Sequence, residues 1–408
     1  MTVQYLLSDV DMGHEEACAV SDVIKGKWLS SGPKTAEFET KFAQYLGAQN
    51  AVALSSCTAA LHLSLLALDI RPGDEVLVPS YTFVASANAI LYSGATPVFV
   101  DITGPHDLNL NIDDLETKIT PNTKAIIVVH MAGFPAEMER LLAVAQRYKL
   151  AVVEDACHAI GASYLGTGRS TLRGRKAGTL GHIGCFSFFA NKNMVTGEGG
   201  MLVTDDDSLA ERVRLARSHG MTKSSWDKAE GRAFDYDVAS LGFNYRCTEI
   251  TAALGMVQLE KLCDSNAKRK TLVARYRHQL RNVEGISIPF SDRLDDSAHH
   301  IFPILLNDRA IRNEIRRFLS ELGIQTSVHY PPVHRFTHYR DRLPKPCRLE
   351  ITEDVSAREV TLPLHPLLAE RDIDVISEAV AEAMAAVDTS RQLAAEHNGT
   401  HRRAGYDS

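Results

Sequence analysis

The sequence predicts an α/β protein with a mostly parallel mixed sheet covered by helices, and a smaller C-terminal α/β lobe. From residue 51 to residue 154, short apolar segments alternate with helical segments. That alternation is typical of parallel strands with helices on both faces. A second set of strand and helix patterns follows residue 300, and the chain's 408 residues can bury a large core.

The individual elements follow from apolar periodicity and turn residues. In the first part of the chain, strands are expected at 51–54, 76–79, 96–100, 125–129 and 151–154. Helices are expected at 14–27, 35–45, 59–68, 86–92, 113–117 and 138–148. Later in the chain, one helix is expected at 248–262 and a long second helix from there to 283. These are followed by a strand at 300–306, a helix at 311–322, a strand near 324–328 and a helix at 373–387.

These patterns predict three parts of the chain. Residues 1–246 form an N-terminal arm and a large domain, and residues 247–388 form a small domain. Residues 389–408 are polar and have no periodic apolar pattern, so we expect a disordered tail.

Composition narrows the classes of function. Hydrophobic residues make up 45% and charged residues 23%, which is ordinary for a soluble enzyme. The net charge of -7 and the lack of a long basic run argue against a nucleic-acid partner. No segment resembles a signal peptide or a membrane span, so we expect no membrane partner. The seven cysteines form no Cys-x-x-Cys pair or metal-ligand spacing, which favours a cytoplasmic location and no metal site.

Three residues between a strand and a helix form a possible anion site. Ser56, Cys57 and Thr58 follow the strand at 51–54 and precede a strongly helical segment. Free backbone N–H groups, the positive end of the helix dipole and hydroxyl donors would meet there. The alternative is that Ser56 or Thr58 only caps the helix.

Further polar residues follow the apolar strands, where ligands bind in open parallel sheets. Ser80 to Phe83, His130, Asp155 and His158 all fall there. Asp155 could bind a ribose, a metal or a protonated ring nitrogen, or it could cap a helix. No second ligand lies at a suitable spacing, so the metal interpretation is set aside.

A lysine follows another apolar run. Residues 183–189 lead into Asn191-Lys192-Asn193, and a glycine-rich loop at 196–200 precedes a new apolar run. A lysine held at a strand end can lose part of its pKa to desolvation and become a nucleophilic amine. The alternative is a surface lysine in a polar loop.

One cofactor accounts for these features together. Pyridoxal phosphate needs a lysine, an acid at its pyridine nitrogen, an anion cradle and usually a flat side chain against its ring. Lys192, Asp155, the helix start at Ser56–Thr58 and Phe83 are candidates for those roles.

The sequence also resembles the pyridoxal-phosphate-dependent nucleotide-sugar aminotransferases of the DegT/DnrJ type, over roughly residues 20 to 385. The motifs that carry the resemblance are Ser31-Gly32-Pro33, Ser56-Cys57-Thr58-Ala59-Ala60-Leu61, Gly73-Asp74-Glu75-Val76, Pro79-Ser80-Tyr81-Thr82-Phe83, Glu154-Asp155-Ala156-Cys157-His158, Phe186-Ser187-Phe188-Phe189 with Lys192, Gly197-Glu198-Gly199-Gly200, Gly242-Phe243-Asn244-Tyr245-Arg246 and His329-Tyr330-Pro331-Pro332.

The resemblance implies an aspartate-aminotransferase-like fold and a homodimer with active sites at the subunit interface. It places Lys192 as the Schiff-base lysine and Asp155 as the partner of the pyridine nitrogen. His158 would lie beside the cofactor's phenolic oxygen, and Phe83 would stack on the ring. The implied phosphate-binding residues are Cys57, Thr58, Ser187 and, from the neighbouring subunit, Asn244. Position 57 is often glycine in this family, and a backbone contact there would make the cysteine of little consequence.

The resemblance also implies the reaction. Glutamate would convert the cofactor to pyridoxamine phosphate, whose amine would pass to a nucleotide-linked keto-deoxysugar. Residues 195–200 look more like members that aminate carbon 4 than carbon 3, which favours a dTDP-4-keto-6-deoxyhexose. Some relatives with histidine at the lysine position dehydrate a sugar, and Lys192 argues against that activity. Two alternatives belong to other classes: a non-catalytic cofactor-binding sensor and a nicotinamide-dependent sugar oxidoreductase. The absence of Gly-x-Gly-x-x-Gly after the first strand argues against the oxidoreductase.

Overall fold

The computed structural model describes residues 3–166, 170–223, 225–231, 234–341 and 347–403, with side chains described up to residue 387, except at residue 225, and at residue 389. The helices of the large lobe are α1 (His14–Gly26), α2 (Pro33–Leu46), α3 (Cys57–Ala67), α4 (Val84–Tyr92), α5 (Ile112–Thr117), α6 (Met138–Tyr148), α7 (Asp207–Ala216) and α8 (Ser225–Ala229). Those that follow are α9 (Glu249–Leu280), α10 (Arg312–Glu321), α11 (Thr337–Arg340), α12 (Glu350–Arg358) and α13 (Glu370–Arg403).

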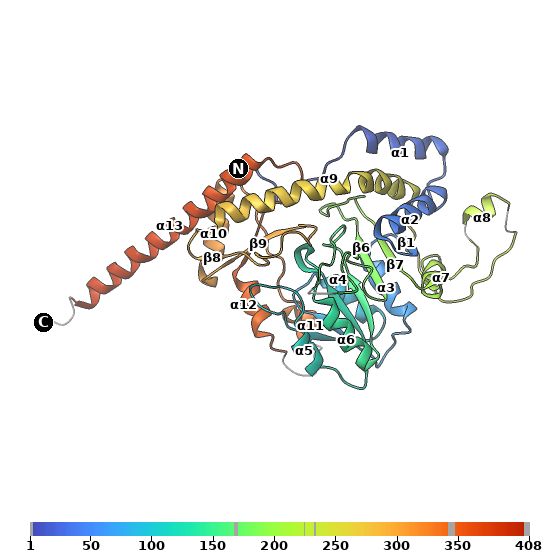
Figure 1. The fold of residues 1–408 in the computed structure, drawn as a ribbon, viewed down its shortest axis with the longest axis horizontal. Helices are drawn as coiled ribbons and strands as arrows, with labels where there is room; N and C mark the ends of the chain where they lie inside the picture. Colours follow the sequence, from blue (N-terminus) through green and yellow to red (C-terminus); the bar gives the residue numbers. More distant parts are fainter. Residues whose placement is uncertain (1–2, 167–169, 224, 232–233, 342–346, 404–408) are drawn as a thin grey trace.

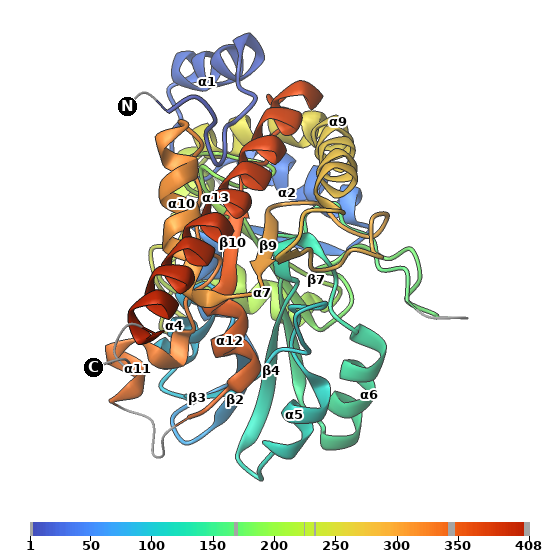
Figure 2. The ribbon, with the colours of Figure 1, turned by 90° about the vertical axis from the view of Figure 1, so that its left-hand side faces the viewer.

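A seven-stranded mixed sheet forms the centre of the large lobe (Figures 1 and 2). Its strands are β1 (Asn50–Leu54), β2 (Glu75–Pro79), β3 (Thr96–Val100), β4 (Thr123–Val129), β5 (Ala151–Asp155), β6 (Ile183–Ser187) and β7 (Gly200–Thr204). Their spatial order is β1-β7-β6-β5-β4-β2-β3. The pairs from β3 to β6 are parallel, and β7 is antiparallel to both β6 and β1. The predicted mostly parallel mixed sheet is therefore confirmed.

Both faces of this sheet are buried under helices, and the side chains of each strand point alternately to one face and to the other. Val76 and Val78 of β2 face the cluster that contains α3, α4 and α7. Leu77, between them, faces the cluster that contains α5 and α6 (Figure 2). A third cluster packs α2 and α9 against β1, β6 and β7. The apolar strands of the sequence thus reflect helices on both faces.

A smaller lobe follows along the C-terminal half of α9. It has a three-stranded antiparallel sheet of β8 (Ile286–Ser287), β9 (Phe302–Leu306) and β10 (Glu359–Leu362), in the order β10-β9-β8. Its core joins this sheet to α9, α10 and α13. The first described residues of the chain lie against it, where Tyr5 bridges Ile324. The boundary predicted at residue 246 stays a proposal.

Some element boundaries differ from the sequence-based expectation. The two helices expected between 248 and 283 are the single helix α9, which passes from α1 and α2 to α13 (Figure 1). Its polar middle is not a break, because the Asn266 amide accepts a hydrogen bond from Asn193 and donates one to the Ile160 carbonyl. The segment 324–328 makes only isolated bridges, so the strand expected there is wrong. The last helix continues to Arg403 rather than ending at 387.

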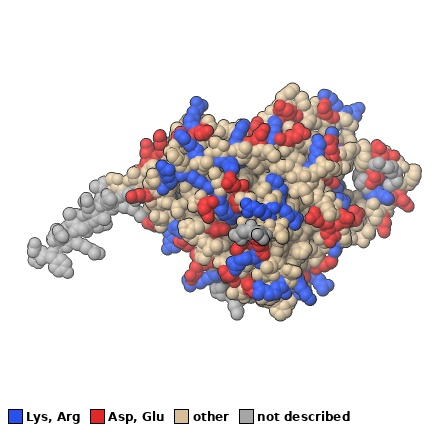
Figure 3. All heavy atoms as spheres, viewed as in Figure 1, with Lys and Arg blue, Asp and Glu red and all other residues tan. Residues whose placement is uncertain are grey.

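Charges of both signs are mixed on the surface. On the face in Figure 3, lysine and arginine side chains lie among aspartate and glutamate side chains without a large patch of one sign. No helix of the described residues is long and apolar enough to cross a membrane. The expectation that nucleic acid is not a partner stays a prediction.

A buried glutamate on β5 fixes the loop that leads into β6. Glu154 lies 2.7 Å from Nε2 of His130 and accepts hydrogen bonds from the N–H groups of Gly178, Leu180 and Gly181. Because a buried acceptor shared by several donors is costly to weaken, Glu154→Gln should lower the free energy of unfolding by roughly 2–4 kcal/mol.

Urea denaturation of Glu154→Gln beside Glu211→Gln, an exposed position on α7, would test this. Equal midpoints for the two variants would contradict the anchoring role.

Candidate active site

A cavity of about 380 Å³ lies beyond the carboxyl ends of the central strands. β4 and β5 contribute Val129 and Asp155, and Ser187 comes from the end of β6. The start of α3, the loop between β6 and β7, and the loop at 329–330 complete the wall. Eight of the predicted site residues line this cavity: Ser56, Cys57, Thr58, Phe83, Asp155, His158, Ser187 and Lys192.

Lys192 lies in a turn after β6, with its half-buried side chain lining the cavity. Its Nζ is 3.3 Å from Nε2 of His300, and Nδ1 of His300 is 2.9 Å from Oδ1 of Asn193. Burial lowers the pKa of Lys192, because an ammonium loses hydration away from water. Burial also lowers the pKa of His300 well below its usual value. The surface-lysine alternative is therefore wrong.

Glycines bring the start of β7 against the start of α3. A Cβ at Gly200 would lie 2.4 Å from the carbonyl carbon of Ser56 and 2.5 Å from the nitrogen of Cys57. Only glycine allows that approach. Ser56 caps α3 by accepting a hydrogen bond of 3.1 Å from the Ala59 N–H; whether it also helps to bind an anion is not decided by this contact. The first N–H groups of a helix can bind an anion, and Ser56, Cys57 and Thr58 lie at the cavity wall, so the predicted anion site there stays a prediction.

Asp155 is a buried carboxylate at the end of β5. Its Oδ2 accepts a hydrogen bond of 2.7 Å from the Ser86 hydroxyl, and its Oδ1 accepts a weaker one of 3.3 Å from the Cys157 N–H. The backbone after β5 therefore orients one oxygen, and α4 orients the other. A carboxylate held in this way can stabilise a nearby positive charge.

His158 and Tyr330 face each other across the cavity. Nε2 of His158 is 2.9 Å from the Tyr330 hydroxyl, while its buried Nδ1 has no partner among the described residues. Burial lowers the pKa of His158 well below its usual value and raises the pKa of Tyr330. His329 is held by hydrogen bonds to Glu359 and Thr361, and burial lowers its pKa to about 4. These groups are therefore uncharged at neutral pH.

The remaining predicted residues differ in position. The ring of Phe83 is 58% exposed at the start of α4, 6.1 Å from the Tyr330 ring, so its face is free to stack. The Ser187 hydroxyl accepts a hydrogen bond from the Phe189 N–H. Asn244 is exposed and does not line the cavity. Its implied role in the neighbouring subunit's site stays a prediction.

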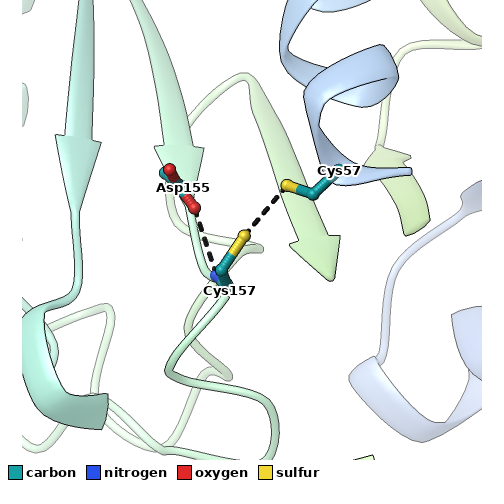
Figure 4. A group of neighbouring side chains, drawn as sticks. All are labelled: Cys57, Asp155 and Cys157. Carbon is teal, nitrogen blue, oxygen red and sulfur yellow. Dashed lines mark hydrogen bonds between the residues drawn. The ribbon is translucent and has the colours of Figure 1, made fainter. Parts of the chain in front are cut away.

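Asp155 and two nearby cysteines have side chains of types that bind metal ions. Ligand atoms of Cys57, Asp155 and Cys157 lie within 4.8 Å of one another (Figure 4). Zn²⁺ binds thiolates, but burial raises the pKa of Cys57 to about 12, and a sulfur contact with Cys57 together with burial raises that of Cys157 well above its usual value. Both oxygens of Asp155 already accept hydrogen bonds. The absence of a metal site stays a prediction.

Comparison with known protein families decides the class. The profile of the DegT/DnrJ/EryC1/StrS aminotransferase family matches residues 10–381. The chain belongs to this family.

Individual relatives agree with that assignment. The spore coat polysaccharide biosynthesis protein SpsC of Bacillus subtilis is 38% identical over 385 residues, covering 92% of this chain and 96% of SpsC. Helicobacter pylori PseC, an aminotransferase involved in the biosynthesis of pseudoaminic acid, is 30% identical with a TM-score of 0.86, covering 94% of this chain and 99% of PseC. The putative sugar aminotransferase Spr1654 of Streptococcus pneumoniae has been solved in a PMP form, to which this chain is 30% identical, and in a PLP form, to which it is 29% identical. Both forms have a TM-score of 0.86 and cover 94% of this chain and 99% of Spr1654.

The protein is thus a sugar aminotransferase, an enzyme of sugar biosynthesis. Its fold is the one shared by the pyridoxal-phosphate aminotransferases of the family, and pyridoxal phosphate is the family's cofactor. The residues present fit that group. The cavity offers a buried amine, a buried carboxylate and a helix start, and Nδ1 of His158 and Oδ1 of Asn191 are buried without partners among the described residues.

Among the residues of this aminotransferase's site to which the sequence assigned no individual role are His300, His329, Tyr330 and Cys157, and the last three lie within motifs quoted above. His300 lies at the start of an apolar strand segment. Because a polar ring buried there needs a hydrogen-bond partner, its position in the sequence is a sign that it belongs to a site. Tyr330 lies in a loop whose path depends on the smaller lobe. Cys157 lies within a motif that was quoted, but its contact with Cys57 joins residues 100 positions apart.

Proposed function

We propose that this aminotransferase transfers the amino group of glutamate to the keto carbon of a nucleotide-linked deoxysugar. The best candidate acceptor is a dTDP-4-keto-6-deoxyhexose, aminated at carbon 4. The observation that carries the proposal is the meeting of Lys192 and Asp155 in one cavity with the helix start at Ser56–Thr58. The choice of carbon 4 rests on the resemblance of residues 195–200.

The site residues would share the work as follows. The N–H groups at the start of α3, with Thr58 and Ser187, would hold the phosphate. Asp155 would keep a proton on the ring nitrogen, and Phe83 would lie against the ring. When bound, pyridoxal phosphate supplies the electron sink that makes the donor's α-carbon acidic.

Lys192 would move the proton. Burial lowers its pKa, so more of it is the neutral amine that can act as a base at neutral pH. His300, 3.3 Å away and buried as the neutral ring, would orient that amine without competing for the proton. Its ring is fixed in turn by Asn193.

Replacement of His300 should slow the reaction without abolishing it. We expect His300→Ala to lower kcat roughly 10- to 100-fold, because the amine of Lys192 would lose its fixed position. KM for glutamate should change little. His299→Ala is the matched control, since the adjacent His299 is also buried but contacts the Leu294 carbonyl. Equal losses in both variants, or a change in KM alone, would contradict the positioning role.

A homodimer with active sites at the subunit interface is part of the proposal. Phe234 and Leu241, which lie between α8 and α9, are 97% and 87% exposed, and exposed apolar side chains favour a protein partner. Asn244 follows Leu241 closely and would reach the neighbour's site. We also propose a cytoplasmic location, supported by the seven free cysteines.

An absorbance titration tests the function. The purified protein with added pyridoxal phosphate should be yellow, glutamate should bleach it, and a dTDP-4-keto-6-deoxyhexose should restore the colour. A 3-keto sugar nucleotide is the matched comparison, and NMR of the product would locate the new amine. Bleaching without restoration by either sugar would discard these acceptors. A protein that takes up no cofactor would overturn the proposal.

The same experiment separates the alternatives. Restoration by only the 3-keto sugar would favour amination at carbon 3. Loss of water from the sugar without uptake of an amine would favour a dehydratase. Cofactor uptake with no bleaching by any amino acid would favour the non-catalytic sensor.

A further inference from the structure

Two thiols meet on the wall of the active-site cavity. Cys57 is the first residue of α3, and Cys157 follows the end of β5. Their sulfur atoms lie 3.0 Å apart, and both residues line the cavity. Figure 4 shows the two side chains directed toward each other from the helix and from the loop after the strand. A disulfide bond is about 2.05 Å long, so the sulfurs need to approach by only about 1 Å.

We infer that Cys57 and Cys157 form a redox-sensitive dithiol, which a small hydroperoxide oxidises to an intramolecular disulfide. Both side chains are free thiols here. Because the reagent is small, it can reach them through the cavity that they line. The pairing is local to the site, since the exposed cysteines, Cys18 and Cys263, do not line this cavity.

The chemistry balances with hydrogen peroxide as the oxidant. One thiol loses its proton, and its sulfur attacks a peroxide oxygen, so the O–O bond breaks and a sulfenic acid and water result. The second sulfur then attacks the first, the S–O bond breaks, and a second water leaves with the other thiol proton. The two sulfurs together lose two electrons, which the two peroxide oxygens gain.

The surroundings set how the rate depends on pH. The thiolate is the reacting form, and burial raises the pKa of Cys57 to about 12, while the sulfur contact with Cys57 and burial raise that of Cys157. The thiolate fraction therefore rises as pH rises toward those values. We expect oxidation to be roughly 10- to 100-fold faster at pH 9 than at pH 7.

The bond would affect the cofactor site, and this consequence rests on the proposed function. Cys57 belongs to the proposed phosphate-binding helix start, and the Cys157 N–H donates to Asp155. A bond between the sulfurs would shift both segments, so the oxidised enzyme should hold pyridoxal phosphate more weakly. Bound cofactor should in turn shield the pair and slow its oxidation about 10-fold or more.

Peptide mapping tests the inference. The cofactor-free and cofactor-loaded enzymes are treated with hydrogen peroxide at pH 7 and pH 9, the remaining thiols are alkylated, and the chain is digested without reductant. We expect a Cys57–Cys157 cross-linked peptide pair that a reductant separates. Cys57→Ala and Cys157→Ala should each lose this pair, and Cys263→Ala should retain it. Because the wild-type map itself identifies the bond, the test does not depend on the variants folding.

Other results would overturn the dithiol. One is a link from Cys57 to Cys185, the buried cysteine of β6. Another is that Cys57 and Cys157 are still reduced when Cys18 and Cys263 have already been oxidised. A third is sulfinic acid at one cysteine without any bond. If the disulfide forms but pyridoxal phosphate neither binds nor protects, the proposed function fails while the dithiol stands.

Discussion

Replacing Lys192 with alanine should reduce turnover about 10⁴-fold or more. The side chain is the buried amine of the cavity, and no other lysine lines that cavity among the described residues. The variant would lose both the covalent attachment of the cofactor and the base that moves the substrate proton. Single-turnover absorbance with glutamate would measure the loss directly.

Three comparisons separate a chemical role for Lys192 from a structural one. Lys192→Ala should still bind pyridoxal phosphate, because the phosphate and ring contacts remain. A small primary amine in solution should restore part of the lost rate, and more as pH rises, since only the neutral amine acts. Lys192→Arg should stay inactive, because a guanidinium keeps its proton. Lys176→Ala, where the lysine donates to the Gly161 carbonyl, is the matched control. Normal turnover in Lys192→Ala would refute the assignment.

The sequence predicts the sheet well because burial on both faces leaves a local signature. Every residue of β4 from Ala125 to Val129 is buried, so the sequence of this strand is a continuous apolar run. The antiparallel direction of β7 has no such signature, because direction depends on the path of the loop before it. The sequence pattern predicts two helices in place of α9 because its middle is polar, and the partners that bury Asn266 there are distant in sequence.

The same distinction explains which site residues were found. Lys192, Asp155 and Ser56 occupy ends of strands and starts of helices, positions that a sequence pattern can locate. His300 contacts Lys192, and Tyr330 lines the cavity, from the smaller lobe and its connecting loop, and only tertiary packing brings them there. The contact between Cys57 and Cys157 is of the same kind, since it joins the ends of two elements that are adjacent in space alone.

Replacing Asp155 with asparagine should lower kcat roughly 10²- to 10⁴-fold. Removing the charge from a buried pair costs roughly 3–5 kcal/mol, and the asparagine amide cannot hold a proton on the ring nitrogen. The pKa of that nitrogen would fall, so its protonated form would be lost at a lower pH than in the wild type. The residual activity of Asp155→Asn should therefore decline as pH rises, which a pH profile of kcat would measure.

A cofactor with a permanent charge separates electrostatics from packing. N-methylated pyridoxal phosphate carries its positive charge without a proton, so it should restore much of the Asp155→Asn activity and remove its pH dependence. Ser86→Ala is the graded control: it deletes the 2.7 Å hydrogen bond to Asp155 but keeps the carboxylate, and it should cost only about 10-fold. An Asp155→Asn enzyme that the methylated cofactor does not improve would mean that Asp155 acts through packing. The negative charge of Asp155 would then not be what the reaction needs at the end of β5.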